Sequence, residues 1–96
     1  MTKLEYKFKR DMSTNALGEN QKLRQIGNNY ILEYYSDSFT ISRNKVVPRL
    51  QLFRKVKENE EHFREWKQIS DFEDFDGDLY KLFNNLTVKE AKELEN

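Results

Sequence analysis

Three groups of residues in the sequence have types and spacings that could support catalysis or metal binding. The first is Glu65-Trp66-Lys67, whose Glu-x-Lys spacing places a carboxylate and a lysine on one face of a strand. Metal-dependent nucleases use this spacing, because the carboxylate holds Mg²⁺ and the lysine stabilises negative charge. Such a site needs a further acid from a neighbouring strand, and Asp37 is the candidate. Alternating charges on a solvent-facing strand explain the triplet more simply.

The other two groups are His62 and the acidic run 74–78. His62 is the only histidine and the chain has no cysteine, so an activated nucleophile would depend on His62 alone. The acidic run resembles the middle of an EF-hand loop, but aligning Gly77 with loop position six puts Phe72 and Phe83 at positions one and twelve. Neither phenylalanine has a side-chain oxygen that could coordinate Ca²⁺. The sequence therefore predicts a protein that is not an enzyme and that uses no metal or cofactor.

Aromatic and basic residues are interleaved between positions 30 and 55, a pattern that favours nucleic-acid binding. Single strands are bound when bases stack on aromatic rings beside a basic groove. The candidates for such a surface are Tyr34, Tyr35, Arg43, Lys45, Arg49 and Arg54. The alternative is that most of the rings form the core, although the adjacent Tyr34 and Tyr35 must point to opposite faces of a sheet.

The charge distribution favours a protein partner instead. Residues 1–55 have a net charge of +6 and residues 56–96 a net charge of −6, so the chain is neutral overall, whereas DNA-binding proteins usually carry a basic excess. The acidic half could meet a basic surface of a partner, and an exposed sheet edge is the other possible docking surface. The candidate residues of the acidic face are Glu58, Glu60, Glu61, Glu73 and Asp74.

The first half of the chain predicts a series of antiparallel strands. They are expected over residues 3–9, 22–26, 30–35, 38–43 and 49–56, with turns at Gly27-Asn28, Ser36-Asp37 and Asn44-Lys45. The strand over 3–9 rests on Leu4, Tyr6 and Phe8, which alternate with charged residues. Pro48 is expected at the start of the strand over 49–56, because proline donates no ladder hydrogen bond.

The second half predicts a charged loop, a last strand and two helices. The loop covers 57–61, and the strand covers 62–69 with Trp66 as its anchor, although Phe63, Trp66 and Ile69 also fit a helical spacing. An apolar stripe at helical spacing from Phe75 to Leu86 predicts a helix that covers one sheet face, capped by Asp74 or Asp76. Thr87 and Glu90 have the spacing of a capping box, which predicts a second helix ending near residue 94.

These elements predict an α+β fold, in which an antiparallel β-meander of four to six strands is followed by one or two C-terminal helices packed on the sheet. The length of 96 residues fits a single domain over 1–96, with a basic, β-rich half at 1–56 and an acidic half at 57–96 that holds the last strand and the helices. Only 36% of the residues are hydrophobic and 35% are charged, but 14% are aromatic, which favours a folded domain with an aromatic core. A partner or a homodimer could add to the stability of so thin a core.

The absence of cysteine and the lack of an apolar stretch in residues 1–10 favour a cytoplasmic location without membrane insertion. The run 26–86 begins with Ile-Gly-Asn-Asn-Tyr-Ile-Leu, and in it Trp-Lys-Gln-Ile leads to a Leu-Tyr-Lys-Leu helix. This pattern resembles small meander-plus-helix proteins of bacterial phages and mobile elements. The resemblance implies an accessory protein that binds and modulates another protein, and single-stranded nucleic-acid binding is the alternative.

Overall fold

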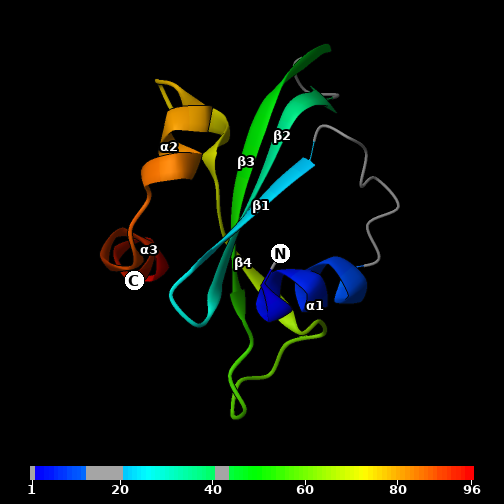
Figure 1. Ribbon diagram of the computed structural model, residues 1–96, viewed down its shortest axis with the longest axis vertical. Helices are drawn as coiled ribbons and strands as arrows, with labels where there is room; N and C mark the ends of the chain where they lie inside the picture. The colour runs from blue at the N-terminus through cyan, green and yellow to red at the C-terminus, as the bar shows by residue number, and fades with distance from the viewer. Residues whose placement is uncertain (1, 13–20, 41–43) are drawn as a thin grey trace.

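One antiparallel sheet carries helices on both of its faces (Figure 1). The structure, a computed structural model, describes residues 2–12, 21–40 and 44–96. Its elements are α1 (Lys3–Asp11), β1 (Gln21–Ile26), β2 (Tyr30–Thr40), β3 (Lys45–Lys55), β4 (Trp66–Asp71), the 3₁₀ helix η1 (Phe72–Asp74), α2 (Leu79–Asn85) and α3 (Val88–Glu95). The strand order is β1-β2-β3-β4, with every neighbouring pair antiparallel. The predicted α+β fold, a meander followed by helices packed on the sheet, is confirmed.

The core is divided into two clusters because alternate residues of each strand point to opposite sheet faces. Leu32 and Leu52 are opposite each other in the ladder and lie under α2 and α3, where they contact Phe83 and its neighbours. Ile31 and Phe53 lie on the other face under α1. There the ring of Phe8 contacts the rings of Phe53 and Trp66, with centroid distances of 5.1 and 5.2 Å.

The prediction of a strand over residues 3–9 is wrong, because these residues form α1. Thr2 and Glu5 make a capping box in which each side chain accepts a hydrogen bond from the backbone of the other, at 3.0 and 3.1 Å. Leu4, Phe8 and Met12 then share one helix face and pack against the sheet. Tyr6, which a strand would have placed beside them, is 63% exposed.

The hairpin predicted at Ser36-Asp37 is also wrong, because β2 runs continuously through these residues. The register of β2 against β3 shifts between Tyr35 and Ser38, which is a β-bulge that absorbs the two turn-forming residues. Pro48 lies inside β3 and not at its start, where the sequence predicted it. It is opposite the bulge, where its lack of an N–H group costs no regular ladder hydrogen bond. Gly27, at φ 62°, occupies the turn between β1 and β2 that the sequence predicts. Residues 41–43 of the predicted strand over 38–43 lie outside the described residues.

The end of the sheet and the C-terminal helices follow the prediction with shifted boundaries. β4 begins at Trp66, so residues 62–65 belong to the preceding loop. α2 begins later than predicted, because Asp78 and neither Asp74 nor Asp76 is its N-cap; the Asp78 carboxylate accepts from the backbone of Tyr80 and Lys81. α3 begins at the predicted capping box of Thr87 and Glu90.

Candidate functional site

The residues predicted to bind nucleic acid are spread over both faces of the sheet. Tyr34 is 8% exposed and packs against the rings of Tyr80 and Phe83, so it cannot stack on a base. Tyr35 is half-buried on the opposite face. Arg49 binds Asp71 at 3.0 Å, Lys45 is exposed at the start of β3, and Arg43 lies outside the described residues.

Arg54, the remaining member of that group, is the centre of a buried ion cluster. Its side chain is 4% exposed and donates two hydrogen bonds to the Glu60 carboxylate, at 2.9 and 2.8 Å, while Glu95 at the end of α3 forms a second ion pair with it. Lys67 contacts Glu60 at 3.2 Å, and the Tyr30 hydroxyl donates to Glu95 at 2.6 Å. The Arg54 guanidinium lowers the pKa of Glu60 to about 2. The cluster ties the loop 57–61 and α3 to the sheet.

The predicted acidic face is divided between the two ends of β4. Glu58, Glu60 and Glu61 precede β4, whereas Glu73 and Asp74 form part of η1, which follows it. β4 has six residues, so the two groups are separated by roughly 20 Å at the usual rise per strand residue. The structure therefore gives Glu73 and Asp74 a different surface from that of Glu58 and Glu61.

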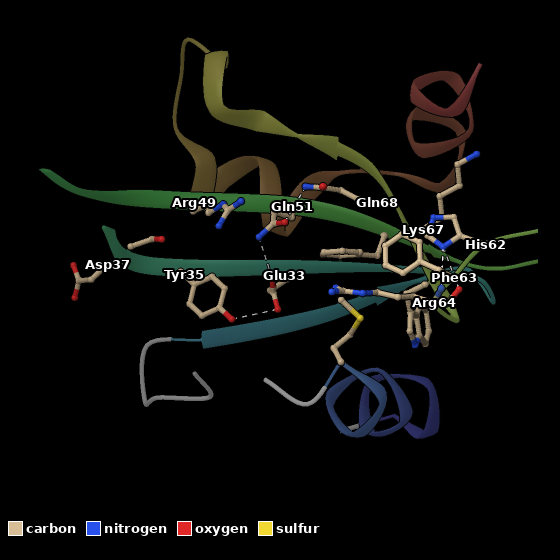
Figure 2. A pocket seen from close by; sticks show the side chains of 14 residues that line it. Glu33, Tyr35, Asp37, Arg49, Gln51, His62, Phe63, Arg64, Lys67 and Gln68 are labelled. Atoms are coloured by element: carbon tan, nitrogen blue, oxygen red, sulfur yellow. Dashed lines mark hydrogen bonds between the residues drawn. The ribbon is translucent and has the colours of Figure 1, made fainter. Parts of the chain in front are cut away.

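The residues considered for catalysis do not come together. The carbonyl of Glu65 accepts from the backbone of Val56 at one end of β3, while Asp37 lies at the bulge opposite Pro48. Figure 2 shows Asp37 at the opposite end of the sheet from His62 and Lys67. His62 is exposed, and its ring stacks on Phe63. Within residues 2–12, 21–40 and 44–96, no three acidic or histidine side chains converge to hold a metal ion.

An apolar groove with an acidic rim lies between η1, α2 and α3. Its volume is about 490 Å³. We call it the acidic-rimmed groove; its apolar lining is Phe72, Phe75, Leu82, Leu86 and Leu94, and its acidic lining is Asp71, Asp74, Glu90 and Glu93. Phe75 and Leu94 are 43% and 42% exposed, which is unusual for large apolar side chains so close together.

The four carboxylates of this rim differ in what they bind. Asp71 pairs with Arg49, and Glu90 accepts from the backbone and hydroxyl of Thr87 in the capping box. The side chains of Asp74 and Glu93 have no ion pair or hydrogen bond with any described residue. No described lysine or arginine lines the groove. Its surface is therefore apolar in the middle and negative at the edge.

A second groove, of about 800 Å³, lies on the face of the sheet that carries α1. Figure 2 shows Glu33 near its middle, with His62, Phe63 and Arg64 at one end. We call it the Glu33 groove. Phe63 is 85% exposed, stacked on the ring of His62 at 5.0 Å, with the Arg64 guanidinium 5.2 Å from its ring centroid.

Glu33 is the buried charge of this groove, since it is only 4% exposed. Its carboxylate accepts a hydrogen bond from Gln21 at 2.8 Å. It also accepts from Gln51 at 3.2 Å and from the Tyr35 hydroxyl at 3.3 Å (Figure 2). Gln68 in turn donates to Gln51 at 2.8 Å, so the network crosses all four strands. Burial raises the pKa of Glu33, while the hydrogen bonds from Gln21 and Tyr35 and the positive charge of Arg49 oppose that rise.

Sequence reasoning missed both grooves for different reasons. Leu94 and Glu93 share the end of α3, but nothing in the sequence places them beside Phe75. For Glu33 a signal was present: it is the only charged residue in the apolar run 30–35, and such a residue in a central strand is buried or functional.

Comparison with protein-family models, with curated proteins and with solved structures gives no match. None of the helices in the described part of the chain is both long enough and apolar enough to span a membrane. The candidate sites are therefore interpreted from their own geometry and chemistry.

Proposed function

We propose that this protein binds another protein without catalysing a reaction, and that the acidic-rimmed groove is its docking surface. The observation that carries the proposal is the combination of two half-exposed apolar side chains, Phe75 and Leu94, with the carboxylates of Asp74 and Glu93, which have no described partner. Exposed apolar surface surrounded by polar residues is typical of protein interaction sites.

The chemistry of the groove indicates the kind of segment that it accepts. An amphipathic helix commonly places its apolar face into a hydrophobic groove of its partner. Here the negative rim favours a helix that carries lysine or arginine beside its apolar residues, because charge complementarity steers association and excludes acidic competitors. The occupant is therefore a basic amphipathic segment of a partner protein. Of the predicted acidic face, only Asp74 lines this groove, whereas Glu58, Glu60, Glu61 and Glu73 do not.

Site-specific crosslinking in a nuclease-treated bacterial lysate tests this proposal. A photo-reactive residue replaces Leu94 in one sample and Tyr6, which is exposed on the outer side of α1, in the control. We expect the Leu94 sample to capture a protein that the Tyr6 sample does not, and we expect the crosslinked peptide to be apolar and basic. Mass spectrometry of the crosslinked peptide is the measurement.

Paired charge reversals show whether capture depends on the rim. Asp74→Lys with Glu93→Lys should weaken capture by about tenfold or more, because two rim charges become repulsive. Glu58→Lys with Glu61→Lys makes the same charge change at the other end of β4 and should change capture by less than about threefold. Equal capture from Leu94 and Tyr6, or loss of capture only in the second pair, would contradict the proposed groove.

A modulatory role for a phage or mobile element, and a cytoplasmic location, remain predictions of the sequence. They are compatible with a small binding protein, and identification of the captured partner would test them. Single-stranded nucleic-acid binding remains the alternative, with Tyr35, Lys45 and Arg49 as its available residues.

A further inference from the structure

The Glu33 groove contains a buried carboxylate whose hydrogen-bond partners are all neutral. Gln21, Gln51 and Tyr35 each donate to Glu33, and no lysine or arginine of the described residues lies within ion-pair distance of it. A buried charge is costly unless an opposite charge or a full set of hydrogen bonds compensates it. The three neutral donors and the positive charge of Arg49, which lies beyond ion-pair distance, compensate it only in part.

The carboxylate also keeps room for one more donor. Oε2 accepts from both Gln21 and Tyr35, whereas Oε1 accepts from Gln51 alone. A carboxylate offers about four acceptor positions, so one position on Oε1 has no donor among the residues that the structure describes. All three donors point toward Glu33, which is the arrangement that an ionised carboxylate requires.

The walls of the groove suit an organic cation. Tyr35, Phe53, Phe63 and Trp66 line the same space as Glu33. Ammonium and guanidinium groups are attracted to aromatic faces, and the attraction grows when the cation is removed from water. A groove that holds a carboxylate and aromatic rings in its lining is therefore complementary to such a cation.

We propose that the Glu33 groove binds an alkylammonium or guanidinium group, which pairs with the Glu33 carboxylate and lies against the aromatic lining. The group belongs either to a free organic amine or to a lysine or arginine side chain of a bound protein. This site lies on the α1 face of the sheet and is independent of the acidic-rimmed groove, so it can exist whether or not that groove binds a partner.

The cations that already line the groove do not fill this role. Arg49 is held by Asp71 at 3.0 Å, and Lys67 is held by Glu60 at 3.2 Å. Arg64 lies over the ring of Phe63, with its guanidinium carbon 5.2 Å from the ring centroid. Arg64 lines the groove and has no described carboxylate partner, so its removal should strengthen binding of a cation.

The test uses butylammonium and butylguanidinium as cationic probes and butanol as a neutral probe of similar length. Trp66 is the only tryptophan and lines the groove, so its fluorescence reports on binding. We expect both cations to give a saturable change in Trp66 emission and to shift the NMR signal of the Glu33 carboxyl carbon, and we expect butanol to do neither. Spermidine and a blocked peptide with one central lysine then distinguish a free amine from a side chain as the natural source.

Three variants complete the test. Glu33→Gln should weaken binding of the cations by about tenfold or more, because a charge-assisted hydrogen bond becomes a neutral one. Glu58→Gln removes the same charge from an exposed loop and should bind like the wild type. Arg64→Gln should bind cations more tightly than the wild type.

The proposal is overturned if Glu33→Gln binds the cations as well as the wild type does, if butanol gives the same response, or if no probe gives a saturable response at millimolar concentration. The carbon signal of Glu33 in the wild-type protein decides the question even if Glu33→Gln does not fold, since a saturable shift caused by butylammonium and not by butanol, at the same pH and ionic strength, requires the charged probe to bind near Glu33.

Discussion

Two buried charged residues show how differently this small protein compensates charge. Arg54 is 3% exposed and forms ion pairs with Glu60 and Glu95, which come from two other parts of the chain. Glu33 is 4% exposed and receives only neutral donors. Arg54 therefore has opposite charges on both sides and a structural role, whereas Glu33 has no ion-pair partner among the described residues, which is the feature on which its proposed binding role rests.

Glu60 should make stability depend on pH in the acid range. Its pKa in the folded protein is lowered to about 2, chiefly by the hydrogen bond from Arg54, whereas an unfolded glutamate titrates near its model value of 4.5. A lowered pKa contributes stability above the unfolded value, and this contribution is lost as the pH falls from about 4.5 toward 2. We therefore expect Glu60→Gln to be less stable than the wild type at pH 7, with a difference that shrinks toward pH 2.

Urea denaturation at a series of pH values between 2 and 7 measures this effect. Glu58→Gln is the matched control, because it removes a carboxylate from the same loop that no described residue binds. A stability difference between Glu60→Gln and the wild type that stays constant over the whole range would show that the ion pair does not form in solution.

At the level of elements, α2 shows that apolar residues at helical spacing can predict which side of a helix packs on the sheet and still give the wrong first residue of the helix. Phe75 belongs to the predicted stripe, but Asp78 caps α2 and leaves Phe75 outside it, edge-to-face with Phe72 at 6.5 Å. The shift removes Phe75 from the core and places it in the acidic-rimmed groove. The groove is therefore a consequence of where α2 begins.

Phe83 and Phe75 should differ strongly in their contributions to stability. Phe83 is 5% exposed between Tyr34 and Tyr80, so Phe83→Ala should cost about 3 to 5 kcal/mol and leave little folded protein at 37 °C. Phe75 is 43% exposed, so Phe75→Ala should cost about 1 kcal/mol or less. Urea denaturation of both variants measures the difference, and equal losses would mean that α2 includes Phe75 in solution.

For the whole molecule, the uneven charge along the sequence does not become two uniform surfaces. Of the basic half, Arg54 is buried and Arg49 is paired with Asp71 from the acidic half. The residues of the predicted acidic face are divided by β4 into two groups, and Glu60 is taken up by the ion pair with Arg54. In the folded protein these two arginines are therefore less accessible to phosphate groups, on whose binding a nucleic-acid surface would depend.

We accordingly expect weak binding of single-stranded nucleic acid. The dissociation constant for a labelled oligonucleotide should be no tighter than about 1 µM at physiological salt, which is the range of non-specific electrostatic binding. Fluorescence anisotropy at several salt concentrations is the measurement, with Lys45→Gln combined with Arg49→Gln as the test variant. Tight binding that falls steeply with salt and is lost in this variant would favour the nucleic-acid alternative over a protein partner.

The sequence by itself predicted the features that depend on residues close together in the chain. The capping box of Thr87 and Glu90, the turn at Gly27 and the apolar alternation of β3 each involve groups a few residues apart, so a short window contains the whole signal. These features were sufficient for the α+β class and for a β-meander followed by C-terminal helices.

Only the tertiary structure decided two kinds of feature. The first are segments whose sequence fits both a helix and a strand, or both a strand and a turn, and the second are contacts between residues far apart in the chain. Residues 3–9 fit both an alternating strand and the helical face of Leu4, Phe8 and Met12, and the helix forms because Phe53 and Trp66 are there to cover Phe8. The strand β2 continues through Ser36-Asp37 because its register against β3 accommodates a bulge. The two grooves and the partners of Arg54 bring together residues far apart in the chain, and their contacts depend on strand register and helix position, which no short window of sequence specifies.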